Sequence, residues 1–160
     1  MKTLKLMCLV IFALVSINCT DNKVKKNEKA EVAIISKEPS LYERLGKAEG
    51  ISALVDEIVA AHLVNPLIKD KFQSLKEDPK RLEVFKNHVK AFLAAGTGGT
   101  EKYSGRDMTA AHAGLKINEK EFLAAVDDIM TVLGNHKIDV ETTKDMLYIL
   151  YSLKGPVMGK

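Results

Sequence analysis

The spacing of hydrophobic residues after Pro39 is the feature that most constrains this chain. They recur three and four positions apart as far as Leu153, and no segment sustains an alternation with a period of two. A period near 3.6 is typical of amphipathic helices, whereas strands with one buried face alternate. The sequence therefore predicts an all-α fold.

Turn and capping residues divide this region into helices. Gly46 ends the first, Pro79 stands at a favoured first-turn position of the third, and Asn118 with Glu121 forms a capping-box-like pair at the fourth. The predicted helices span about residues 40–45, 50–64, 78–95, 118–133 and 139–153.

The first twenty residues carry the pattern of an export signal. Two lysines precede a mostly apolar run over residues 6–17, which is shorter than the roughly 20 apolar residues of a spanning helix. Cys19 stands where bacterial lipoprotein signals place the lipidated cysteine, although Ser16 and Asn18 replace the leucine and small residue usual there. We expect a signal peptide over residues 1–18 and lipidation of Cys19, with ordinary cleavage and a free Cys19 thiol as the alternative.

Composition divides the rest of the chain. Residues 19–38 are polar and Lys-rich and are predicted to form a tether, residues 39–153 the domain, and residues 154–160 a C-terminal tail. The protein would then be exported and held at a bacterial membrane through its lipid. The other cysteine, Cys8, falls in the signal, so the domain has no disulfide.

Charge and motifs disfavour several functions. The chain has 24 Lys and Arg against 21 Asp and Glu, and two of the lysines lie in the signal, which leaves 22 against 21. A nearly neutral domain without a basic patch interleaved with aromatics is not expected to bind nucleic acid. The sequence carries no phosphate loop, nucleophile triad or zinc-spaced cluster, which disfavours a hydrolase or transferase. The adjacent Asp127 and Asp128 are expected on a solvated helix face.

A weakly helical segment follows the third helix. It holds four glycines before His112 and one after it, and such a stretch has little helix propensity, so we expect a bound group to order it. His112 shares a face with Met108, Ala111 and Leu115, and neutral imidazole is the commonest metal ligand in proteins. A histidine on an apolar face is more often a hydrogen-bonded core residue, so the spacing alone leaves both interpretations open.

The third helix carries a second histidine of this kind. At about 100° per residue, Phe85, Val89 and Phe92 share one arc, and His88 falls within it. Two histidines on apolar faces of neighbouring segments could grip a flat, mostly apolar cofactor.

Several motifs together resemble the group I truncated haemoglobins. They are "SLYERLG" at 40–46, "NP" at 65–66, Phe72 in "KDKFQ", "AFLAAGTGGTEKYSGRDMTAAHAGLKI" at 91–117 and "NEKEF" at 118–122. The most specific part is Gly98-Gly99 followed by Tyr103, Gly105, Met108 and His112. The likeness covers residues 39–153. It implies a two-on-two helical sandwich around one haem b, with His112 as the proximal iron ligand and a glycine-rich segment wrapped round the haem edge.

The resemblance also implies the other cofactor contacts. Phe72 would pack on the porphyrin from the distal side, and the full expected set is His112, Phe72, Phe85, His88, Val89, Met108, Tyr103, Leu115 and Val59. Family members carry a distal tyrosine and glutamines where this chain has Val59, Phe85 and Val89. The missing hydrogen bonds contribute about 1.5–3 kcal/mol, so dioxygen should escape about ten- to hundredfold faster.

The remaining polar residues leave alternatives open. His88 is expected as a sixth iron ligand, as a hydrogen-bond donor to bound gas, or as a pocket-edge residue bonded to a propionate or water. His62 and His136 are expected to be exposed or capping. The candidates for pairing with haem propionates are Arg106, Lys86, Lys90 and Lys102.

The implied function is binding of dioxygen, nitric oxide or carbon monoxide at a haem. Oxidation of nitric oxide to nitrate is a candidate reaction, which would need a reductase of unknown identity, so enzymatic activity is left uncertain. One alternative is a six-coordinate haem redox or sensor protein with His112 and His88 on iron. Another is a haem-free lipoprotein that uses the helical domain as an interaction module.

Overall fold

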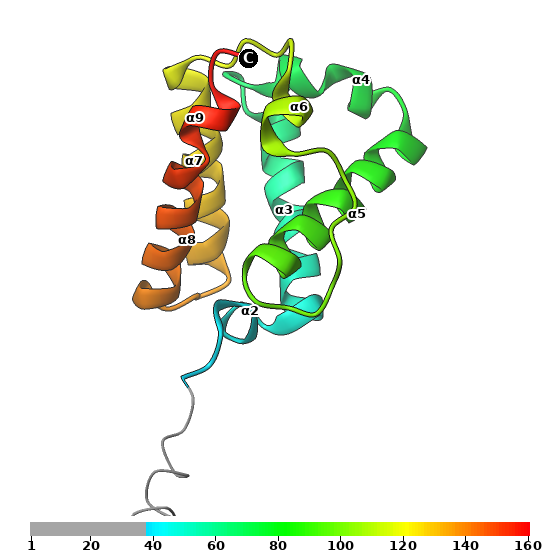
Figure 1. The fold of residues 1–160 in the computed structure, drawn as a ribbon. Coiled ribbons are helices and arrows are strands. Elements are labelled where there is room, and N and C mark those ends of the chain that lie inside the picture. The colour runs from blue at the N-terminus through cyan, green and yellow to red at the C-terminus, as the bar shows by residue number, and fades with distance from the viewer. Residues whose placement is uncertain (1–37) are drawn as a thin grey trace, which may run out of the picture. The chain divides into compact units, whose positions relative to one another are not determined.

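The computed structural model describes residues 38–160, and over those residues it consists of helices and loops (Figure 1). In chain order the elements are α2 (Leu41–Arg44), α3 (Lys47–Val64), the 3-10 helix η1 (Lys69–Phe72), α4 (Gln73–Lys76), α5 (Pro79–Gly96), α6 (Met108–His112), α7 (Glu119–Asn135), α8 (Val140–Ser152) and α9 (Lys154–Val157). The predicted all-α fold is confirmed. The signal peptide, Cys19 and the tether up to residue 37 lie outside the described residues and stay predictions.

Two helix pairs form the frame of the domain. α3 packs on α5, α7 packs on α8, and α3 also contacts α7 across the middle. Figure 1 shows α7 and α8 side by side on one side of the domain, with α3 and α5 on the other and α6 above them. The predicted two-on-two sandwich is confirmed.

Capping residues set the helix starts. Ser40 and Glu43 form a capping box at α2, and Asn118 and Glu121 form the predicted box at α7. The Asp78 carboxylate accepts hydrogen bonds from two backbone N–H groups in the first turn of α5. Caps of this kind stabilise a helix by about 1 kcal/mol each.

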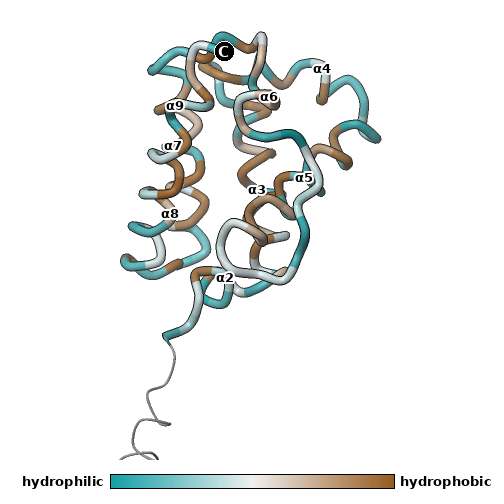
Figure 2. The backbone as a smooth tube through the Cα atoms, viewed as in Figure 1, coloured by the Kyte–Doolittle hydropathy of each residue, from teal (hydrophilic) through white to brown (hydrophobic). Residues whose placement is uncertain are grey.

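The core lies between the two pairs. Figure 2 shows hydrophobic residues recurring along α3, α5, α7 and α8, with hydrophilic residues between them and in the connections. The buried cluster consists of Leu45, Ile51, Leu54, Val55, Ile58, Val59, Ala94, Val132, Leu133 and Met146. α3 contributes half of these residues, so it is the central helix of the fold.

The C-terminus is part of the fold and not only a tail. Residues 154–157 form α9, which packs on α6. The backbone N–H of Lys116 donates to the Lys160 carbonyl at 2.9 Å, and that of Gly159 donates to Ile117 at 3.0 Å. These contacts fix α6 and the chain that follows it, where the sequence offered little local order.

The glycine pair before α6 serves a close approach to α2. Gly98 has φ of +100°, and the Gly99 N–H donates to the Ala94 carbonyl at 2.8 Å. A Cβ on Gly99 would lie 2.8 Å from the Tyr42 ring, and the Tyr42 N–H donates to Thr97 at 2.9 Å. Neither glycine lines the cavity described below, whereas Tyr103, Arg106 and Met108 of the same glycine-rich segment do.

Across residues 38–160 no single helix is long and apolar enough to cross a membrane. α3 taken together with Lys69–Lys76 passes the same test by length and composition, with the two parts bent by 115°.

Candidate functional site

A cavity of about 570 Å³ opens between the two helix pairs. Its volume lies within the range of about 300–1,000 Å³ typical of small-molecule and cofactor sites. α3, η1 and α5 line it from one side, and α6, α7 and α8 from the other. Most of the side chains are aliphatic or aromatic, and three of the four histidines reach it: His62, His88 and His112.

His112, the last residue of α6, presents an imidazole suited to a metal. Its Nδ1 lies 2.8 Å from the Met108 carbonyl oxygen one turn earlier. A carbonyl only accepts, so Nδ1 carries the hydrogen and Nε2 keeps its lone pair. A backbone carbonyl that fixes the ring in this way is the usual support of a metal-bound histidine. Asp107 caps the helix by accepting from the Ala110 N–H at 2.9 Å.

Aromatic side chains form the opposite wall. The Phe72 ring lies 6.1 Å from the Phe85 ring in an edge-on arrangement, and Val89 follows one turn along α5. All three line the cavity, as do Met108 and Leu115 near the predicted ligand. Such a wall suits a flat apolar group and offers it no hydrogen-bond donor.

Val59 does not belong to this wall. It is 3% exposed and packs in the core cluster, and it is absent from the residues that line the cavity. α3 instead presents Val55, Ile58 and His62, spaced three and four apart. Adjacent helical residues point about 100° apart, so Val59 faces away when Ile58 faces the cavity.

His62 is a cavity residue that the sequence interpretation missed. It was expected to be exposed or capping, and this is wrong: it is 8% exposed and lines the cavity. Its Nδ1 lies 2.8 Å from Asp128 Oδ2, and its ring lies 5.5 Å from Phe72. The signal was present, since His62 stands four residues after Ile58 on the same helical face.

Asp128 holds the His62 ring. Its predicted place on a solvated helix face is therefore wrong. The half-buried carboxylate accepts from His62 and, through both oxygens, from the Asn65 amide at 2.9 and 3.0 Å. Asp127 alone lies on the exposed face that was expected for the pair. His136 is exposed at the C-cap of α7, where it pairs with Glu57 at 2.9 Å, so its prediction is confirmed.

His88 lines the cavity from α5 and is an exposed residue, which places it at the cavity mouth. Of the four propionate candidates, Arg106 lines the cavity, as do Lys71 and Arg81, which the sequence did not single out. These cations would meet carboxylates of a bound group at this edge. Lys71 also pairs with Glu121 at 3.2 Å.

Two of the predicted propionate partners are engaged elsewhere. Lys86 and Lys90 both reach Asp56 at 3.0 Å, across the contact of α5 with α3, and neither lines the cavity. Lys102 does not line it either. Tyr103 lines the cavity and is fixed at the bend, because its ring packs edge-on against Phe92 at 5.2 Å and its hydroxyl donates to the Arg106 carbonyl at 2.6 Å.

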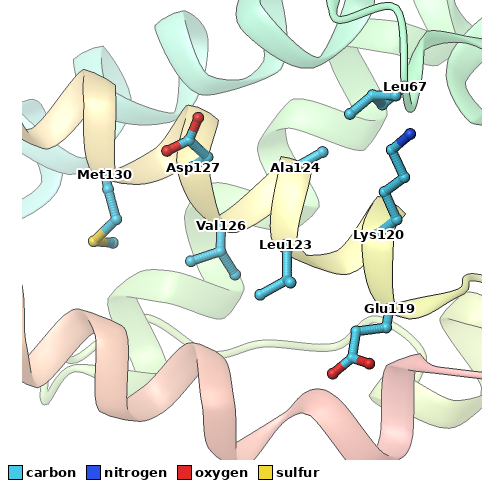
Figure 3. Close-up of a pocket in the computed structure, with 8 residues that line it drawn as sticks. All are labelled: Leu67, Glu119, Lys120, Leu123, Ala124, Val126, Asp127 and Met130. Atoms are coloured by element: carbon cyan, nitrogen blue, oxygen red, sulfur yellow. The ribbon is translucent and has the colours of Figure 1, made fainter.

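A second hollow lies on the outside of α7. It is an open groove whose side chains come from α7, apart from Leu67 (Figure 3). The groove carries no histidine, and Asp127, Glu119 and Lys120 lie among its polar residues. Within the described residues no group of three His, Cys, Asp or Glu is arranged to hold a bare metal ion. Of the two hollows, only the internal cavity is lined by histidines.

The buried His62 predicts a pH dependence of stability. Burial lowers the pKa of His62 below its ordinary value of 6.5, and the Asp128 carboxylate offsets this only in part. Below pH 6.5 the unfolded chain therefore binds a proton at His62 that the folded chain does not bind. The free energy of unfolding falls as the pH drops from 6.5, until the pH passes the pKa of His62 in the folded chain. Between pH 7.5 and 5.5 we expect a loss of up to about 1.4 kcal/mol in the free energy of unfolding by urea.

The control for this titration is a variant without the imidazole. His62→Leu should abolish the loss between pH 7.5 and 5.5, whereas the exposed His136→Leu should retain it. An equal loss in wild type and His62→Leu would contradict the assignment.

Comparison with known proteins agrees with this geometry. The family model of bacterial-like globins matches residues 40–158. A group 1 truncated hemoglobin of Nostoc commune is 28% identical over 121 residues, which cover 76% of this chain and 98% of the relative. One of Synechocystis is 34% identical over 98 residues, covering 59% of this chain and 75% of the relative.

Solved structures give the same result for the fold. The Fe(III) form of truncated hemoglobin from Tetrahymena pyriformis superposes with a TM-score of 0.69 at 20% identity, covering 76% of this chain and all of that one. Family model, sequence relatives and fold agree, and the chain belongs to the bacterial-like globins as a truncated haemoglobin.

Proposed function

We propose that this chain binds one haem b in the internal cavity and, through it, small diatomic gases. The observation that carries the proposal is the state of His112, whose Nδ1 is held by the Met108 carbonyl so that Nε2 remains as a lone-pair donor. The iron of a bound haem supplies the coordination position at which a gas binds.

The cavity residues fit such a group. Phe72, Phe85 and Val89 provide an apolar wall for a porphyrin face. Arg81 and Arg106 stand at the mouth, where propionates would lie. His88 also lines the cavity and is exposed, which favours the interpretation as a residue at the cavity edge that bonds a propionate or water.

The distal wall determines how gases would be held. Phe85 and Val89 offer no hydrogen-bond donor, and the hydrogen on His62 points to Asp128. Dioxygen would therefore escape about ten- to hundredfold faster than from a pocket with one or two good donors. This favours exchange of gas over storage, and it leaves oxidation of nitric oxide as a secondary candidate reaction.

Absorption spectra of the haem-reconstituted protein test the proposal. We expect one haem per chain, a ferrous spectrum without a sixth ligand, and complete conversion by carbon monoxide. Absence of a Soret band after haem addition would contradict the proposal and favour a haem-free interaction module. Sharp six-coordinate ferrous bands that disappear in His88→Ala would favour the redox or sensor alternative.

A further inference from the structure

The haem binding proposed above assigns no role to the pair formed by His62 and Asp128. His62 is about nine-tenths buried and lines, from α3, the same cavity that His112 lines from α6. Its Nδ1 faces Asp128, whose carboxylate is in turn held by the Asn65 amide. A buried imidazole whose Nδ1 is held by a carboxylate that is itself held by a second side chain is more ordered than the packing of an apolar wall requires.

The hydrogen-bond partners fix the tautomer of this ring. The ionised carboxylate of Asp128 only accepts, so Nδ1 of His62 carries the hydrogen. Nε2 is then a bare lone pair, and it makes no hydrogen bond to any residue in the described part of the chain. His62 thus offers the cavity a proton acceptor and not a donor, unlike the groups that stabilise bound dioxygen.

We propose that His62, oriented by Asp128, is a proton-accepting site that makes the haem cavity selective for small neutral weak acids such as hydrogen cyanide and hydrogen sulfide. The inference rests on the proposed haem binding. The acid HX enters without charge, its X–H bond breaks, an N–H bond forms at Nε2 of His62, and the anion stays in the cavity at the haem. No electron is transferred. The proton that leaves HX is the one that binds Nε2 of His62, so the anion and the imidazolium together carry the same atoms and charge as HX and the neutral ring.

Two features of the surroundings act on this transfer in opposite directions. Burial lowers the pKa of His62, which keeps the ring an unprotonated acceptor at pH 7 but also makes it a weaker base. Once the ring is protonated, the Asp128 carboxylate at 2.8 Å stabilises the imidazolium. None of the other charged or imidazole side chains that line the cavity makes a hydrogen bond to His62. They are Lys71, Arg81, His88, Arg106, His112 and Glu121.

Association rates of two ligands with the haem-reconstituted full chain test the proposal. Hydrogen cyanide, the neutral form present at pH 7, must lose a proton to bind, whereas carbon monoxide carries none. His62→Leu is expected to slow hydrogen cyanide association with the ferric protein by about a hundredfold or more, as for loss of a general base. The association of carbon monoxide with the ferrous protein should keep its rate.

A second variant keeps the histidine and changes only its partner. Asp128→Asn can donate from its amide to Nδ1, which moves the hydrogen to Nε2. Cyanide association should then slow, while dioxygen escape also slows because the ring has become a donor. Asp127→Asn on the neighbouring exposed position is the matched control and should change neither rate.

Nuclear magnetic resonance of the carbon monoxide form gives a readout that needs no ligand kinetics. The nitrogen shifts of His62 should report a protonated Nδ1 and a bare Nε2 at pH 7, and Asp128→Asn should change them. Equal slowing of cyanide and carbon monoxide in His62→Leu, or a wild-type ring with its hydrogen on Nε2, would overturn the inference.

The outcomes separate this inference from the proposed function. If the wild type binds haem and carbon monoxide but its cyanide rate does not depend on His62 and Asp128, the inference fails and haem binding stands. If the wild type takes up no haem, both fail. If His62→Leu does not fold, the Asp128→Asn rates and the nitrogen shifts decide.

Discussion

Replacing His112 by alanine is expected to lower haem affinity by more than about a hundredfold, because loss of residues that merely orient a metal ligand already costs about ten- to hundredfold. His112 is the one imidazole in the described cavity whose Nδ1 is held by its own helix, which leaves Nε2 to bind iron. Transfer of haem to a competing apoglobin, followed at the Soret band, measures the effect.

Two controls accompany this substitution. His136→Ala removes an imidazole that lies outside the cavity and should leave haem affinity unchanged. Imidazole added to the solution should restore a ligated spectrum in His112→Ala, since the alanine leaves room for the free ring. Stoichiometric haem with an unchanged spectrum in the alanine variant would remove the basis of the proposed function.

The arrangement of helices was predictable because the signals that set it are local. Ser40, Asp78 and Asn118 each cap a helix through neighbours within three residues, and the apolar period needs no knowledge of partners. The apolar neighbours of His112, Met108 and Leu115, left its role open, and the assignment of His112 as iron ligand came from the resemblance of the surrounding motif to the family.

The distal side was less predictable because α3 is apolar on more than one face. Val55, Ile58 and Val59 are all buried, so the sequence does not show which of them faces the cavity. Val59 was assigned to the site by carrying over the position of the family's distal tyrosine, and a shift of one residue along a helix turns the side chain by about 100°. A helix with one polar face would have fixed this rotation.

Partners far apart in the sequence were not predictable at all. His62 and Asp128 are 66 positions apart, and Lys90 and Asp56 are 34 apart. Each of these side chains has several oppositely charged candidates along the chain, and only the packing of α3 against α5 and α7 selects one. The need for glycine at position 99 was also not predictable from nearby residues. A side chain there would collide with the ring of Tyr42, which lies far back in the sequence on α2.

The same packing predicts the largest effect on stability. Leu133 on α7 is 1% exposed and belongs to the core cluster, and it does not line the haem cavity. Leu133→Ala should therefore lower the free energy of unfolding by about 2–5 kcal/mol, a large share of the roughly 5–15 kcal/mol of a typical domain. Because the lost side chain lies outside the cavity, added haem should not refill the space it leaves.

Leu123 on the same helix provides the matched control. It is 43% exposed at the open groove of Figure 3, so Leu123→Ala should change the free energy of unfolding by less than about 0.5 kcal/mol. Urea unfolding of the haem-free proteins measures both values. Equal effects of the two substitutions would mean that α7 does not face the core through Leu133, and the pairing of α7 with α3 across the cavity would then have to be redrawn.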